Sequence, residues 1–135
     1  MTEPVLRVEQ VESFYGKIQA LRGIDIEVAP GQIIAVLGSN GAGKTTTLKT
    51  ISGLVRAQVG RIHFDGEDIT RLPPHEIARM GVVHIPEGRH ILKGLSVQEN
   101  LELGSFTVRD PAVRRALVAD VFERFPILSE RRHQD

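Results

Sequence analysis

The chain of 135 residues contains no cysteine and no tryptophan, and only 4% of its residues are aromatic. The lack of cysteine excludes a disulfide scaffold, a cysteine-ligated metal and thiol chemistry, and it fits a cytosolic location. The 17 basic residues balance the 17 acidic ones, so the formal net charge is zero. No overall basic field therefore attracts nucleic acid, and no acidic tail is present.

Long hydrophobic runs are also missing. The longest unbroken apolar run is residues 33–37, far short of the roughly 20 residues that span a membrane. The first four residues show neither the basic nor the apolar region of a signal peptide. The five histidines stand at no metal-binding spacing. We therefore expect one soluble domain, with any membrane contact made through a partner.

One stretch stands out among what is present. Residues 38–45 read Gly-Ser-Asn-Gly-Ala-Gly-Lys-Thr and match the phosphate-loop pattern G-x-x-x-x-G-K-[ST] at every fixed position. The glycines let successive backbone N–H groups surround an anion. Lys44 can reach the terminal phosphates of a nucleotide, and Thr45 offers a hydroxyl to Mg²⁺. The alternative is a glycine-rich loop with a solvated lysine, but the expected strand before the stretch and helix after it favour nucleotide binding.

The residues before this loop alternate between apolar and polar types. Residues 6–9 and 24–28 predict strands of an antiparallel sheet with one solvated face, and residues 14–17 predict a turn. Residues 33–37 are apolar on both faces, which predicts a buried central strand. The fold class that these patterns favour is α/β.

The residues after the loop predict mostly helices. A helix is expected from about residue 43 to 54. It begins with three threonines, which are poor helix formers, and this suggests that its N-terminus serves to bind an anion and a metal. Its inner face is expected to carry Leu48, Ile51 and Leu54. A strand is expected at 61–65 with a turn at Asp65-Gly66, followed by a helix at 73–81 and a buried strand at 82–85. A Ser96–Glu99 capping box predicts the start of a further helix. The last expected helix is capped by Asp110 and ends at Pro126, and its apolar face is expected to carry Val113, Leu117, Val121 and Phe125.

These motifs together resemble the nucleotide-binding subunits of ABC transporters. The resemblance rests on the phosphate loop, on Tyr15 upstream of it, on the Pro30-Gly31-Gln32 lead-in, and on residues 83–88 followed by 95–101. Within that family, residues 38–43 and 85–89 are similar to the ATPase subunits of branched-chain amino acid importers; urea importers carry a close relative. The resemblance implies a P-loop ATPase core with an antiparallel β subdomain over about residues 5–90 and the start of a helical subdomain over about 91–135.

The resemblance also implies the cofactors ATP and Mg²⁺ and a set of site residues. Tyr15 would stack on adenine, Lys44 would stabilise the γ-phosphate, and Thr45 would hold Mg²⁺. Glu87, where most of the family has glutamine, is a tentative catalytic and metal contact. The expected nucleotide-binding residues are Tyr15, Gly38, Ser39, Asn40, Gly41, Ala42, Gly43, Lys44, Thr45 and Thr46. The alternatives without a binding role are that Tyr15 is a surface tyrosine and that Glu87 is an acidic residue of an exposed loop.

Some family features are absent from these 135 residues. No L-S-G-G-x-Q-like signature occurs, no apolar strand ends in Asp-Glu, and no later switch histidine follows. Residues 92–94 also replace the Phe-Pro-Arg-like segment of the family. The chain is therefore expected to be the N-terminal half of such a subunit, with weak or absent recognition of ATP·Mg²⁺, little hydrolysis and poor solubility.

The resemblance implies a working context for the full-length design. It would hydrolyse ATP in a head-to-tail dimer with a second ATP-binding subunit and energise import of branched-chain amino acids through membrane permease subunits. It would lie on the cytoplasmic face of the cell membrane, without inserting and without binding nucleic acid. Two alternatives stay open: a non-catalytic fragment that only binds nucleotide or a partner, and an ABC-type ATPase for another substrate such as urea or for nucleic acid.

Overall fold

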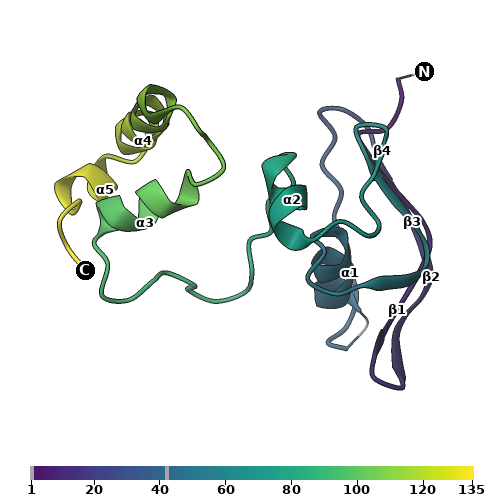
Figure 1. Cartoon of the computed structure of the whole chain (residues 1–135). Helices are drawn as coiled ribbons and strands as arrows, with labels where there is room; N and C mark the ends of the chain where they lie inside the picture. Colours follow the sequence, from purple (N-terminus) through teal and green to yellow (C-terminus); the bar gives the residue numbers. More distant parts are fainter. Residues whose placement is uncertain (1, 42) are drawn as a thin grey trace. The chain divides into compact units, whose positions relative to one another are not determined.

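The computed structural model describes residues 2–41 and 43–135 and divides the chain into two compact units, Met1–His84 and Ile85–Asp135 (Figure 1). The first unit contains four strands and two helices, and the second contains three helices. The elements in chain order are β1 (Leu6–Tyr15), β2 (Ile18–Val28), α1 (Lys44–Ile51), β3 (Ala57–Phe64), β4 (Glu67–Asp68), α2 (Pro74–Arg79), α3 (Val97–Gly104), α4 (Pro111–Arg124) and α5 (Pro126–Glu130).

The first unit is built on a four-stranded antiparallel sheet in the order β2-β1-β3-β4. Helices α1 and α2 each supply an apolar residue, Ile51 and Ile77, to a core that also contains Val8, Val11, Leu21, Ala57, Ile62 and Ile69. The α/β fold class and the antiparallel subdomain before the loop are confirmed, as is the turn at Asp65-Gly66.

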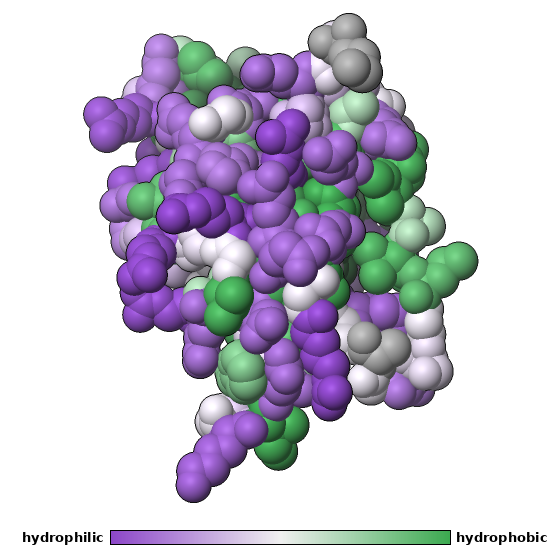
Figure 2. All heavy atoms as spheres, turned by 90° about the vertical axis from the view of Figure 1, so that its right-hand side faces the viewer, coloured by the Kyte–Doolittle hydropathy of each residue, from purple (hydrophilic) through white to green (hydrophobic). Residues whose placement is uncertain are grey.

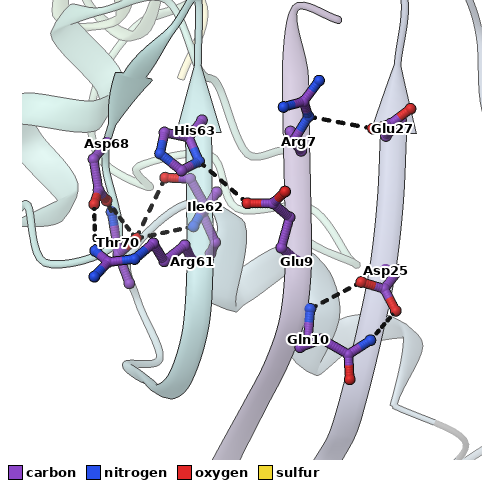
Figure 3. A network of polar contacts seen from close by, with 10 residues as sticks. All are labelled: Arg7, Glu9, Gln10, Asp25, Glu27, Arg61, Ile62, His63, Asp68 and Thr70. Carbon is purple, nitrogen blue, oxygen red and sulfur yellow. Dashed lines mark hydrogen bonds and ion pairs between the residues drawn. The ribbon is translucent and has the colours of Figure 1, made fainter.

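Polar side chains link the strands across the sheet (Figure 3). Arg7 pairs with Glu27 at 3.2 Å, and Arg61 pairs with Asp68 at 3.0 Å. The Gln10 backbone N–H donates to Asp25 Oδ1 at 2.9 Å. On the face shown in Figure 2, hydrophilic side chains cover most of the surface, with apolar patches among them. The sheet therefore has the solvated face that the alternation of apolar and polar residues predicts.

The segment at 33–37 is not the expected buried central strand. It forms no strand, and Ile33 and Leu37 are 95% and 89% exposed. A strand that is apolar on both faces needs neighbours that pair with its backbone, and within residues 2–41 and 43–135 no strand pairs with it. The prediction of a strand at 82–85 is wrong for the same reason, because Val83 and Ile85 are exposed in an irregular segment.

Helix α1 is shorter than expected and buries a different face. It ends at Ile51, and Leu48 and Leu54 are about half exposed. Its buried residues are Thr47, Thr50 and Ile51. The threonine hydroxyls are satisfied within the helix, since Thr47 donates to Gly43 O at 2.8 Å and Thr50 donates to Thr46 O at 2.7 Å. Two buried threonines thus replace two of the leucines that periodicity alone placed in the core.

The second unit begins its helices as the sequence predicts. Ser96 and Glu99 form a complete capping box at the start of α3, and the Asp110 side chain accepts from Ala112 N at 2.8 Å at the start of α4. The predicted apolar stripe of α4 is wrong, because Val113, Leu117 and Phe125 are exposed and Phe122 is the buried residue. Pro126 ends α4 and also opens a further helix, α5.

Candidate functional site

The phosphate loop leads directly into helix α1. Gly43 occupies the N-cap position with φ of +95°, and α1 begins at Lys44. No side chain caps this helix start, and its first turn contains no acidic residue. The first N–H groups of a helix have no partner within the helix, and the helix dipole is positive there. A bound phosphate would therefore act as the cap that the sequence leaves out.

The loop rests closely on strand β2. A Cβ atom at Gly43 would lie 3.0 Å from Leu21 Cδ2 and 3.3 Å from the Ala20 carbonyl oxygen. The positive φ and this close approach both require glycine at position 43. The contact fixes the start of α1 against the sheet, and it is a feature that the loop pattern alone did not reveal.

The Lys44 side chain folds back over the loop. Its Nζ donates to the Gly38 carbonyl oxygen at 2.5 Å, which joins the two ends of the pattern. The ammonium group thus lies beside the first residue of the pattern. An incoming phosphate oxygen carries a full charge and would compete with this neutral carbonyl for the ammonium.

The three threonines that follow Lys44 point to different places. Thr45 is exposed at the helix start, so its hydroxyl can reach a metal ion beside the phosphates. Thr46 is half-buried, and Thr47 is buried with its hydroxyl bonded to Gly43 O. Thr45 therefore fits a Mg²⁺ contact, whereas Thr47, which is not among the expected binding residues, has its hydroxyl bonded to Gly43 O.

Tyr15 lies beside this helix start although it precedes Thr46 by 31 residues. It is the last residue of β1 rather than part of the predicted turn, and its side chain is 49% exposed. Its hydroxyl lies 3.5 Å from Thr46 Oγ1. The structure thus places an exposed aromatic ring next to the start of α1, at the end of a strand in the same unit.

The remaining predicted loop residues are exposed. Gly38, Ser39, Asn40 and Gly41 are all exposed to solvent, and Gly41 has φ of +86°. Ala42 lies outside the described residues. The left-handed conformations at positions 41 and 43 are those that let neighbouring N–H groups converge on an anion.

Glu87 belongs to the second unit, where it is exposed and lies in no helix or strand. Its role toward a metal or water stays a prediction. Across the described part of the chain, no group of three His, Asp or Glu side chains could hold a metal ion. Among the same residues, none of the helices combines the length and apolar character that crossing a membrane requires.

Comparison with known proteins agrees with this geometry. The family model for the ABC transporter matches residues 21–134. The chain is 40% identical over 130 residues to the high-affinity branched-chain amino acid transport ATP-binding protein BraG of Pseudomonas aeruginosa, covering 96% of this chain and 55% of that protein. It is 36% identical over 125 residues to the lipopolysaccharide export system ATP-binding protein LptB of Haemophilus influenzae, covering 91% and 52%.

A third relative and a solved structure extend the comparison. The chain is 42% identical over 97 residues to the probable branched-chain amino acid transport ATP-binding protein LivG of Archaeoglobus fulgidus, covering 72% of this chain and 38% of that protein. The ADP conformation of MJ1267, an ATP-binding cassette of an ABC transporter, superposes with a TM-score of 0.78 at 29% identity, covering 98% of this chain and 57% of that one.

The chain spans about half the length of the curated relatives BraG and LptB. The resemblance drawn from the phosphate loop, Tyr15 and residues 83–101 is confirmed by a family match that covers most of the chain. Together with the loop geometry at α1, that match shows that this chain belongs to the ABC transporter family.

Proposed function

We propose that this chain is part of an ATP-binding subunit and that its phosphate loop is where that subunit holds ATP with Mg²⁺. The observation that carries the proposal is the uncapped start of α1, with Lys44 and Thr45 at its first positions and Tyr15 beside it. The similarity to ATP-binding subunits, and to a cassette in its ADP conformation, supports the same conclusion.

Each residue has a distinct role in this proposal. The backbone N–H groups of residues 41–46 surround the phosphates, and the Lys44 ammonium moves from Gly38 O to a phosphate oxygen. The Tyr15 ring offers an exposed face on which adenine stacks. The Thr45 hydroxyl is the ligand that this chain offers to Mg²⁺, and the ion, when bound, neutralises charge on the phosphates.

Glu87 is the proposed second contact for metal or water. A carboxylate there, in place of the glutamine usual in the family, adds negative charge near a cation. A Glu87→Gln variant removes that charge and keeps the hydrogen-bonding shape. If Glu87 contacts Mg²⁺, this change weakens Mg²⁺-dependent ATP binding and leaves Mg²⁺-free binding unchanged.

For the whole protein we infer ATP hydrolysis that energises import of branched-chain amino acids. The names of BraG and LivG, which state branched-chain amino acid transport and ATP binding, support the substrate. The names of LptB and of the ribose import protein RbsA 2 of Escherichia coli show that comparable similarity extends to other substrates. The proposed partners are a second ATP-binding subunit and membrane permease subunits, with the protein on the cytoplasmic face of the membrane.

Nucleotide binding is tested by titrating the chain with ATP and Mg²⁺ and comparing wild type with Lys44→Ala. Loss of one charge-assisted contact is worth about 1.5–3 kcal/mol, or roughly tenfold or more in affinity. Lys49→Ala is the matched control, because Lys49 lies in the last turn of the same helix. Equal ATP affinity in wild type and Lys44→Ala would overturn the proposal.

The import proposal has a separate test. Cells that lack the gene for the whole protein should lose uptake of labelled leucine, isoleucine and valine and keep uptake of urea. Restoration by the wild-type gene, and not by the Lys44→Ala gene, would tie that uptake to the phosphate loop. Lost urea uptake with intact amino acid uptake would favour the urea alternative.

A further inference from the structure

A cavity of about 400 Å³ lies within the second unit, far along the sequence from the phosphate loop. Its walls come from α3, α4 and the segment after α5. Three arginines, Arg114, Arg115 and Arg132, line it together with Glu102. Its apolar lining includes the buried Phe122 and the partly buried Val118.

Two of these arginines are held in place by backbone groups. Arg114 Nε donates to the Val108 carbonyl oxygen. Arg132 Nε donates to Ser129 O at 3.2 Å, and its guanidinium carbon lies 4.8 Å from the centre of the Phe122 ring. Arg132 also donates from a terminal nitrogen, Nη2, to Ser129 Oγ at 2.7 Å. Each of the two guanidinium groups keeps further terminal N–H donors for another acceptor, and a carboxylate is the acceptor whose geometry matches it best.

The opposite charge in the cavity is also held in place. Glu102 Oε1 accepts from Gln98 Nε2 at 2.9 Å, one turn away on α3. The four ion pairs found in residues 2–41 and 43–135 involve neither Glu102 nor any of the three arginines. Positive and negative groups therefore line one cavity without forming an ion pair with each other, and apolar side chains lie beside them.

This arrangement matches a zwitterion with an apolar body. We propose that the cavity binds an α-amino acid with an apolar side chain. The arginines receive the carboxylate, Glu102 receives the ammonium group, and Phe122 and Val118 contact the side chain. A simple anion would pair with the guanidinium groups but leave the Glu102 carboxylate without a cationic partner, and a simple cation would meet three guanidinium groups.

The binding inference stands on the cavity alone and does not depend on nucleotide binding. Its consequence does rest on the proposed function: a subunit that powers uptake of apolar amino acids would also sense the same amino acids. Such a site would let the amount of imported amino acid act back on the subunit.

The test is equilibrium dialysis of the full chain with labelled L-leucine, with circular dichroism as a check on folding. Arg115→Gln is the principal variant, because Arg115 is exposed and supports no described hydrogen bond. Binding should weaken about tenfold or more in Arg115→Gln and in Glu102→Gln. Arg124→Gln is the control, because Arg124 lies on the same helix, pairs with Asp120 at 2.8 Å and does not line the cavity.

Analogues of leucine separate the two charges. 4-Methylpentanoate lacks the ammonium group, and 3-methylbutylamine lacks the carboxylate, so both should bind at least tenfold more weakly than L-leucine. Absence of L-leucine binding at millimolar concentration would overturn the proposal. Equal binding of 4-methylpentanoate, or equal affinity of Arg115→Gln and wild type, would overturn it as well.

Discussion

At the scale of single residues, the phosphate-loop pattern predicts the position of some side chains and not of others. The pattern identified Lys44 and Thr45 correctly as residues at the helix start, because a fixed spacing places them there. The expected binding residues included Thr46 and not Thr47, but the sequence did not show that Thr46 lies beside Tyr15 and that the Thr47 hydroxyl bonds to Gly43 O. That difference depends on which helix face meets the sheet, and a local pattern does not contain this information.

A second residue-scale feature is the close packing of Gly60 on β3 against a bulge of β1. A Cβ atom at Gly60 would lie 2.3 Å from the Glu9 carbonyl oxygen, and Gln10 in that bulge has φ of +47°. The near atoms belong to the β1 backbone at Glu9 and Gln10, which cannot move away as a flexible side chain could. We therefore expect Gly60→Ala to lower the free energy of unfolding by roughly 3 kcal/mol or more.

Gly66→Ala is the matched control for this prediction. Gly66 also has a positive φ, +80°, but its Cβ position is open. It should therefore show only the conformational cost, about 1–2 kcal/mol. Chemical denaturation of both variants measures the difference, and equal destabilisation would show that the contact with Glu9 is unimportant.

At the scale of elements, local signals were reliable where they act within a few residues. The capping box at Ser96 and Glu99 and the cap at Asp110 formed as predicted, because each needs only its own helix turn. The segment at 33–37 failed, because a central strand depends on distant neighbours. Sequence periodicity predicts the tendency of a segment, whereas pairing partners decide whether a strand forms.

The capping box leads to a prediction on pH. The Ser96 backbone N–H, and after it the Ser96 hydroxyl, lower the pKa of Glu99 below its ordinary value of 4.5. A lowered pKa stabilises the folded form above about pH 4.5, and this contribution is lost as the pH falls through the lower, folded value. Helix α3 should therefore begin to lose order below pH 4.5, as followed by hydrogen exchange of its amides.

The serine of the same box can be tested at neutral pH. Ser96→Ala removes the acceptor for Glu99 N, a bond of 3.2 Å, and should cost about 1 kcal/mol. The Glu99 carboxylate still accepts from the backbone of residue 96 in this variant, so part of the pH dependence should remain. Unchanged unfolding at pH 7 would contradict this account of the cap.

The exposed segment at 33–37 leads to a prediction on solubility. Five consecutive apolar residues without strand partners form a surface that associates with other chains. The chain should therefore self-associate at micromolar concentration, and a Leu37→Lys variant should do so less. A cooperative thermal transition of a wild-type monomer, shown by light scattering and calorimetry, would count against this expectation.

At the scale of the whole molecule, the 135 residues contain the phosphate-loop pattern but neither the L-S-G-G-x-Q-like signature nor an apolar strand that ends in Asp-Glu. Catalysis of phosphoryl transfer needs charge stabilisation from several directions at once. We therefore expect little ATP hydrolysis by the 135-residue chain, measured as phosphate release. Turnover that is present in wild type and abolished by Lys44→Ala would contradict this prediction.

The central claim is that residues 41–46 form the nucleotide site of this chain, and hydrogen exchange of their amides tests it most directly. With millimolar ATP and Mg²⁺, the amides at the start of α1 should exchange more slowly, because they donate to phosphate oxygens. The amides of Gln98 and Val97 in the second unit should be unaffected. Unchanged exchange across 41–46, in a sample that binds ATP by dialysis, would contradict the account.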